Sequence, residues 1–185
     1  MYVTAAESRG LARIFGLLSE DLAEHDVREA VGHHLLELLE ADYYASFVWQ
    51  DATRRFEKAA FLNMDPNNLA NYDIYFQYRD PITFKLQARR EATLVTQVMP
   101  QRDLMRTEFF NDFLARDGLH WGVNAYSFVG NHNIGDVRIC VTAGARISMR
   151  IRWSCYVWSN PPSPAHSPAP AANPPSQACA NARRC

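Results

Sequence analysis

Proline divides this sequence into two unequal parts and limits where a packed domain can form. Seven of the ten prolines lie within residues 161–175, where most of the other residues are alanine or serine. Proline fixes φ and has no backbone N–H, so such a stretch cannot form a packed helix or enter a DNA major groove as one. We therefore expect one folded domain over residues 1–140 and a disordered tail over residues 141–185.

The charged residues and the cysteines are also distributed differently in residues 1–140 and in residues 141–185. The net charge is −1, but residues 141–185 carry five arginines and no Asp, Glu or Lys, so residues 1–140 carry −6. An acidic body does not suit nucleic acid, and we expect no direct DNA binding from this chain. The body is cysteine-free until Cys140, which fits a reducing compartment. The sequence shows no membrane-spanning run and no signal peptide, so we expect a cytoplasmic protein.

Periodic patterns in residues 1–140 predict an α+β domain. Apolar spacing predicts a first helix within residues 5–24 and a second from about Val27 to Glu40, opened by a capping box of Asp26 and Glu29. An aromatic and β-branched run over residues 43–49 predicts a strand that pairs with residues 56–62 as a hairpin. The remaining segments predict helices near residues 66–80, 81–90 and 107–114, and strands at 93–98, 121–129 and 137–140. This order predicts an antiparallel sheet of about five strands with helices on its faces.

The densest group of large side chains with polar tips lies in residues 71–82. Pro81 disfavours helical geometry at Asp80 and suits the start of a new helix, so Asp80 is expected to end one helix and cap the next. Two interpretations stay open, a helix that packs aromatics into a core and a pocket wall where tyrosine hydroxyls and the Asp80 carboxylate face a small ligand. Four aromatic residues fall within seven positions: Tyr72, Tyr75, Phe76 and Tyr78.

Motifs for catalysis or metal binding are missing from the sequence. The cysteine spacings match no zinc pattern, and the adjacent His33 and His34 point about 100° apart on a helix, so they do not chelate one ion. There is no phosphate-cradling glycine loop and no G-x-S-x-G nucleophile. We expect no enzyme, no metal and no cofactor.

Three strings stand in a characteristic order: Tyr72, Tyr75 and Tyr78 ahead of Asp80-Pro81, then Thr107-Glu-Phe-Phe-Asn-Asp-Phe-Leu114 with Gly118, then Gly135-Asp-Val-Arg-Ile139. Together with the order of helices and strands, they resemble the PAS/GAF-like sensory domain at the N-terminus of LuxR-type bacterial transcription regulators. The resemblance covers roughly residues 10–140. It implies a signal-sensing domain with a PAS/GAF-like sheet.

The resemblance also implies a ligand site. In the acyl-homoserine-lactone branch of that family, a Tyr and a Trp ahead of an Asp-Pro step line the pocket, and the Asp meets the ligand amide. The corresponding candidates in this sequence are Tyr72, Tyr75, Tyr78 and Asp80. No tryptophan stands between Trp49 and Trp121, which departs from that branch, so a lactone is one candidate among small-molecule signals. The alternative functions are an interaction module that forms a homodimer through residues 5–40, and a remnant without a ligand.

The tail departs from the family pattern. Regulators of this type continue into a helix-turn-helix that binds DNA, whereas this chain continues into the proline-rich stretch. The neighbouring reading frame of GC-rich codons from Cys140 onward can encode a charged turn, an Asp N-cap and an amphipathic helix. Met149, Trp153 and Trp158 each have a single codon, which restricts the neighbouring frame most, and their codons are compatible with this alternative reading. We therefore hypothesise a frameshift near Cys140 that makes residues 141–185 unselected sequence and truncates the regulator. The alternative is a genuine Pro/Ala-rich tail.

Overall fold

The computed structural model describes residues 4–145, so residues 146–185 of the tail expected over residues 141–185 lie outside them. Val141, the first residue of that expected tail, is the last residue of a strand and is 1% exposed. The described residues form one antiparallel five-stranded sheet in the order β2-β1-β5-β4-β3, which confirms the predicted α+β fold. The strands are β1 (Tyr43–Gln50), β2 (Arg55–Leu62), β3 (Thr93–Leu94), β4 (Trp121–Val129) and β5 (His132–Val141).

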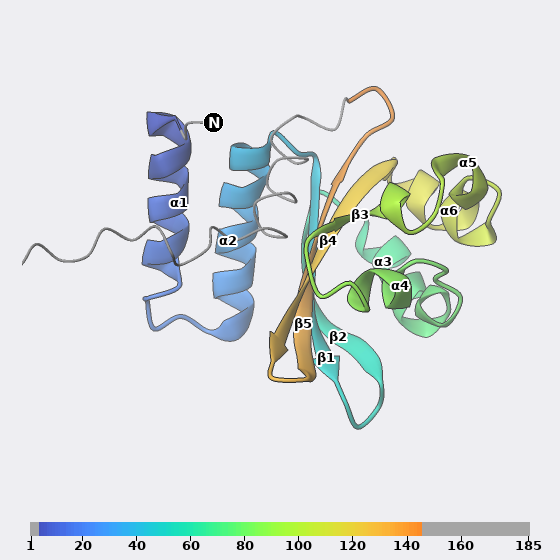
Figure 1. Ribbon diagram of the computed structural model, residues 1–185, viewed down its shortest axis with the longest axis horizontal. Coiled ribbons are helices and arrows are strands. Elements are labelled where there is room, and N and C mark those ends of the chain that lie inside the picture. The colour runs from blue at the N-terminus through green and yellow to red at the C-terminus, as the bar shows by residue number, and fades with distance from the viewer. Residues whose placement is uncertain (1–3, 146–185) are drawn as a thin grey trace, which may run out of the picture.

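Helices cover both faces of the sheet (Figure 1). One face carries α1 (Ala5–Leu17) and α2 (Glu24–Leu39), with α1 lying outside α2. The other face carries α3 (Pro66–Ile74), α4 (Thr83–Gln87), α5 (Gln101–Leu104) and α6 (Glu108–Asp112), joined by short 3₁₀ turns at Phe76–Tyr78, Val95–Gln97 and Leu114–Arg116. Within residues 4–145, no helix combines the length and apolarity that crossing a bilayer requires.

Strand β5 lies at the centre of the sheet, although it is the last of the strands within residues 4–145. It pairs with β1 on one side and β4 on the other, and Tyr43 stands opposite Cys140. Gly135 makes the close approach to β1 feasible, because a Cβ at this position would lie 2.4 Å from the carbonyl oxygen of Phe47. Its φ of +157° is also one that glycine adopts most readily.

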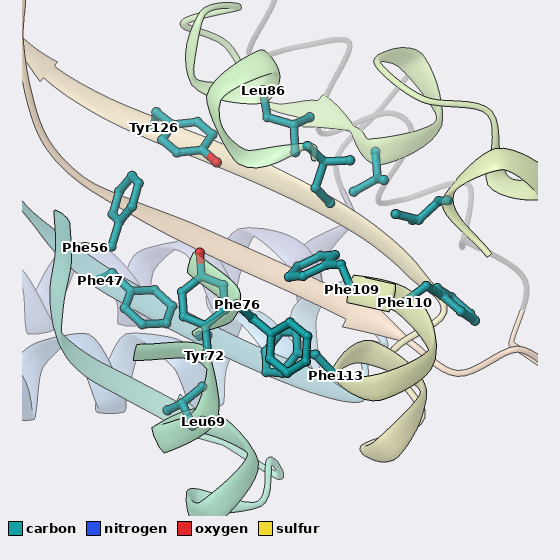
Figure 2. Packing of buried hydrophobic residues seen from close by; sticks show 14 residues of the cluster. Phe47, Phe56, Leu69, Tyr72, Phe76, Leu86, Phe109, Phe110, Phe113 and Tyr126 are labelled. Atoms are coloured by element: carbon teal, nitrogen blue, oxygen red, sulfur yellow. The ribbon is translucent and has the colours of Figure 1, made fainter. Parts of the chain in front are cut away.

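Each face of the sheet has its own hydrophobic core. On the α2 face, Leu36 and Leu39 pack on Tyr44, Val123 and Ile139. The larger core lies on the opposite face, where α3 to α6 pack against the strands (Figure 2). Its aromatic residues include Phe47, Phe56, Tyr72, Phe76, Phe109, Phe110, Phe113 and Tyr126. The interpretation of the aromatic stretch as core is therefore confirmed for Tyr72 and Phe76, which are 1% and 6% exposed.

Two predicted helix boundaries are wrong. The second helix begins at Glu24 with Ala23 as its N-cap, so Asp26 lies in the first turn and forms no capping box with Glu29. An acidic first turn is still favourable, because it faces the positive end of the helix dipole. The helix before Asp80 ends at Ile74, since Tyr75 leaves helical geometry with φ −134° and ψ −60°.

Two helix starts agree with the sequence, whereas one predicted strand is much shorter than expected. The helix expected near residues 66–80 does begin at Pro66, and Asp65 caps it by accepting from the N–H of Asn67. Thr107 caps α6 through the N–H of Phe110. The strand expected over residues 93–98 is only two residues long, Thr93–Leu94, before the chain turns into a 3₁₀ helix.

Candidate functional site

A cavity lies between the sheet and the helices α3 to α6. The empty space there is about 660 Å³, a volume that includes the part open to solvent. A narrow apolar cavity of this kind suits a thin, flexible chain better than a rigid bulky ring system. Its apolar walls include Phe47, Leu69, Val95, Leu104, Phe109 and Phe113, several of which are visible in Figure 2.

A connected polar network interrupts these apolar walls. We define it as Tyr72, Asp80, Thr83, Asp136 and Arg138. Four of its members line the cavity, and the side chain of Asp136 lies behind Arg138 with no exposed surface. Buried polar groups in an apolar wall are expensive unless they are hydrogen-bonded, so the pattern of bonds in the network indicates which groups have spare capacity.

The Asp80 carboxylate accepts four hydrogen bonds. Its Oδ1 accepts from the backbone N–H groups of Ile82 and Thr83 at 2.8 and 2.9 Å, so Asp80 fixes the turn that leads into α4. The prediction that Asp80 is itself the N-cap is wrong, because the helix begins at Thr83 and Ile82 holds that position. Its Oδ2 accepts from the Thr83 hydroxyl at 2.6 Å and from the Tyr72 hydroxyl at 3.4 Å. A carboxylate offers about four lone-pair positions, so Asp80 is saturated, and the bond from Tyr72 is its longest.

The Tyr72 hydroxyl joins Asp80 to Arg138. It donates to Asp80 Oδ2 and accepts from Arg138 Nη1 at 2.9 Å. Burial raises the pKa of Tyr72 above its ordinary value, and the nearby Arg138 opposes that shift without cancelling it. Tyr72 is therefore a neutral donor at neutral pH.

Arg138 is a guanidinium enclosed by aromatic rings and a carboxylate. Its Nε donates to Asp136 Oδ2 at 2.8 Å, and Asp136 Oδ1 accepts from the N–H of Phe47 at 3.0 Å. The Cζ atom lies 4.5 to 5.2 Å from the ring centres of Phe47, Phe56 and Tyr72, a distance at which cation–π attraction is effective. Burial raises the pKa of the Asp136 carboxyl, and the Arg138 charge opposes that shift.

The structure brings two of the four predicted ligand residues to the cavity. Tyr72 and Asp80 line it, whereas Tyr75 and Tyr78 lie outside its lining. The Tyr75 hydroxyl donates to Glu108 Oε1 at 2.8 Å on an exposed surface, beneath the guanidinium of Arg79. Tyr78 is 61% exposed and its ring faces Arg55.

Sequence reasoning missed Arg138 and Trp121 as cavity residues. Arg138 stands between Val137 and Ile139, which belong to the core on the α2 face, so strand alternation places it on the opposite, cavity face. The signal in the sequence was an arginine at a strand position whose side chain points toward a face covered by helices. Trp121 lines the cavity from β4, beside His120, so the cavity has a tryptophan that lies far along the chain from Asp80. Within residues 4–145, no three His, Cys, Asp or Glu side chains gather as metal ligands.

No family model and no curated protein matches this sequence, but several solved structures share its fold. CepR2 from Burkholderia cenocepacia, described as an N-acylhomoserine-lactone-dependent LuxR family transcription factor, has a TM-score of 0.59 and 12% identity over 85% of this chain and 98% of its own. SdiA of Escherichia coli, solved with octanoyl-rac-glycerol, has a TM-score of 0.57 and 19% identity over 82% of this chain and 62% of its own.

GAF domains share the fold as well. The GAF domain of a phosphoenolpyruvate-protein phosphotransferase from Coxiella burnetii has a TM-score of 0.62 and 13% identity over 83% of this chain and 88% of its own. At these identities the comparisons show the fold, which is the one expected for a LuxR-type sensory domain. The chemistry of the site depends on the residues of this chain.

Proposed function

We propose that this chain is the signal-sensing domain of a LuxR-type transcription regulator and that it binds a small amphiphile, without acting as an enzyme. The observation that carries the proposal is the polar network set into the wall of an otherwise apolar cavity. Apolar walls can hold an acyl chain, and a few placed polar groups can fix the head group.

The hydrogen bonds suggest how a head group enters the network. Asp80 already accepts four bonds, so a ligand N–H or O–H can reach it only by replacing a present donor. The bond from Tyr72 is the longest at 3.4 Å, and its loss leaves the two backbone bonds intact. The released Tyr72 hydroxyl can then donate to a carbonyl oxygen of the ligand.

The neighbours named above support this class of ligand. SdiA was solved with an acylglycerol and CepR2 is described as dependent on an acylhomoserine lactone. Both ligands join an acyl chain to a head group with a carbonyl and hydrogen-bonding groups. For this chain, acylglycerols and acyl-homoserine lactones are therefore the two probes to test first.

Thermal shift in the presence of monooctanoylglycerol and N-octanoyl homoserine lactone tests the proposal. A ligand that binds the native state raises the melting temperature. Tyr72→Phe and Asp80→Asn should reduce that shift, because both change the network. Tyr75→Phe is the matched control, since Tyr75 lies outside the cavity, and it should keep the full shift. The proposal fails if neither amphiphile raises the melting temperature of the parent protein.

A second proposal concerns residues 5–40. Helix α1 has no buried residue, and it presents an apolar stripe in which Leu11, Phe15 and Leu18 are 40%, 66% and 60% exposed. We propose that a second copy of the chain covers this stripe, because a two-fold pairing buries both copies of the stripe at once.

Light scattering after size-exclusion chromatography tests this pairing. The parent protein should have the mass of a dimer, and Phe15→Glu should give a monomer. The matched control is Ile74→Glu on α3, since Ile74 is 75% exposed on the other side of the sheet and should leave the mass unchanged. A monomeric parent protein at the concentrations of the experiment would contradict the pairing.

A further inference from the structure

The Arg138 guanidinium has one nitrogen without a partner. Nε bonds Asp136 and Nη1 bonds Tyr72, but Nη2 is buried and has no hydrogen-bond partner among the residues that the structure describes. An unsatisfied donor on a buried charged group is costly, so it is a strong site for an acceptor supplied from outside the chain. Arg138 is one of the residues that line the cavity, so a ligand held there lies next to the guanidinium. Nη2 itself is buried, so a small shift of the surrounding side chains must open it to the ligand.

The charges around Arg138 limit what that acceptor can be. Asp136 holds Nε at 2.8 Å, and a second carboxylate, Asp80, belongs to the same network through Tyr72. Among the described lining residues, Arg138 is the only arginine or lysine. One carboxylate therefore contacts the guanidinium, and a second lies one hydrogen-bonded hydroxyl away, near enough to act on its charge. A ligand carboxylate would add a third negative charge at low dielectric, whereas a carbonyl oxygen accepts the Nη2 hydrogen bond without adding charge.

We propose that this cavity selects neutral acyl compounds, esters or amides, over free fatty acids of the same chain length, with the ligand carbonyl accepting from Arg138 Nη2. This inference rests on the proposed function, because it specifies the head group for the same cavity. It makes Arg138 a specificity residue through its free nitrogen, with Asp136 and Asp80 together excluding anions.

Binding of three eight-carbon probes to the full chain tests this inference by isothermal titration at pH 8. Monooctanoylglycerol is a neutral ester, octanoate is an anion, and octanol is neutral but lacks a carbonyl. The ester should bind at least tenfold more tightly than either of the others. Octanoate binding as tightly as the ester would overturn the charge selection, and octanol binding as tightly would overturn the role of the carbonyl. Failure of all three to bind would instead contradict the proposed function.

A charge variant gives a second, independent measurement. Asp80→Asn removes one carboxylate but retains an oxygen that can accept from the N–H groups of Ile82 and Thr83. It should improve octanoate binding relative to the ester by about tenfold. Asp65→Asn is the matched control, because it removes the same charge from the cap of α3 outside the cavity and should leave the ratio unchanged. An unchanged ratio in Asp80→Asn would overturn the role of the two carboxylates.

Discussion

The Tyr72 hydroxyl lies 2.9 Å from Arg138 Nη1, so the bond joins the helical layer to the central strand of the sheet. Both side chains lie at the wall of the cavity, where Tyr72 is 1% exposed and the Arg138 side chain is 13% exposed. A ligand that changes the bonding of Tyr72 therefore acts on a contact between two layers. This is a route by which occupancy of the cavity can alter the packing of the whole domain.

Removing the Tyr72 hydroxyl should measure the strength of this contact. Tyr72→Phe leaves Arg138 Nη1 without its acceptor and should lower the free energy of unfolding by about 1–3 kcal/mol, as measured by urea denaturation. Tyr75→Phe removes a hydroxyl that bonds Glu108 at an exposed position, and it should change stability by less than about 0.5 kcal/mol. Equal losses of unfolding free energy in the two variants would show that the buried hydrogen bond of Tyr72 stabilises the fold no more than the exposed bond of Tyr75.

The same tyrosine should make the domain sensitive to alkaline pH. Burial raises the folded-state pKa of Tyr72, whereas an unfolded tyrosine ionises near pH 10. The unfolded chain therefore releases a proton that the folded protein retains. The stabilising contribution is complete below about pH 10 and is lost as the pH rises above it. Urea denaturation from pH 9 to 11.5 should show a falling stability.

Tyr126 has its pKa raised by burial too, so it contributes to this fall as well. Tyr72→Phe should make the slope shallower by up to about 1.4 kcal/mol per pH unit, the value for one proton. If stability falls with pH at the same rate in the parent and in Tyr72→Phe, the raised pKa of Tyr72 does not contribute to the alkaline sensitivity.

Cys140 should react slowly in the native protein. Its thiol lines the cavity, and burial raises the pKa of Cys140 to about 12. Only the thiolate is nucleophilic, and an ordinary cysteine has a pKa near 8.5, so alkylation at pH 8 should be about a thousandfold slower than in the urea-unfolded chain. Mass spectrometry of the peptide that contains Cys140 separates it from the other cysteines. Equal rates in native and unfolded protein would contradict the burial of this thiol.

Gly32 tests how closely α2 packs against the sheet. A Cβ at Gly32 would lie 2.6 Å from the ring of Tyr44, which is 1% exposed and held by a bond from its hydroxyl to the carbonyl of Arg28. Alanine gains up to about 1 kcal/mol in a helix, but overpacking costs about 1–3 kcal/mol. Gly32→Ala should therefore lower the free energy of unfolding.

The control is Gly16→Ala in α1, where a Cβ would meet nothing within 4 Å. It should raise stability by about 0.5–1 kcal/mol. Thermal denaturation of both variants gives the comparison. A gain in stability from Gly32→Ala similar to that from Gly16→Ala would mean that α2 is not held against Tyr44.

Local chemistry explains which parts of the fold could be predicted. The hairpin of β1 and β2 and the start of α3 at Pro66 both depend on neighbours within a few residues. The end of α3 at Ile74 could not be predicted in this way. Tyr72 and Phe76 both enter the core, and the chain must leave helical geometry at Tyr75 to turn toward α4.

The site was predictable only in part for the same reason. Tyr72 and Asp80 are eight residues apart, so one sequence segment contains both. Arg138 is 66 residues from Tyr72, and their contact depends on the pairing of β5 with β1. Tyr75 and Tyr78 belong to the same aromatic segment as Tyr72, but the break at Tyr75 turns them away from the cavity. The aromatic spacing assumed one continuous helix and could not reveal that break.

The central place of β5 has a consequence for synthesis on the ribosome. Strands β1 and β2 emerge early, but β5, which joins them to β4 and β3, is translated after the other four strands of this sheet. Until then the nascent chain has two half-sheets, each with an open edge able to pair with other chains. Chains released before His132 should therefore aggregate or be degraded. Force measurements on stalled nascent chains should detect folding only after Val141 has left the exit tunnel.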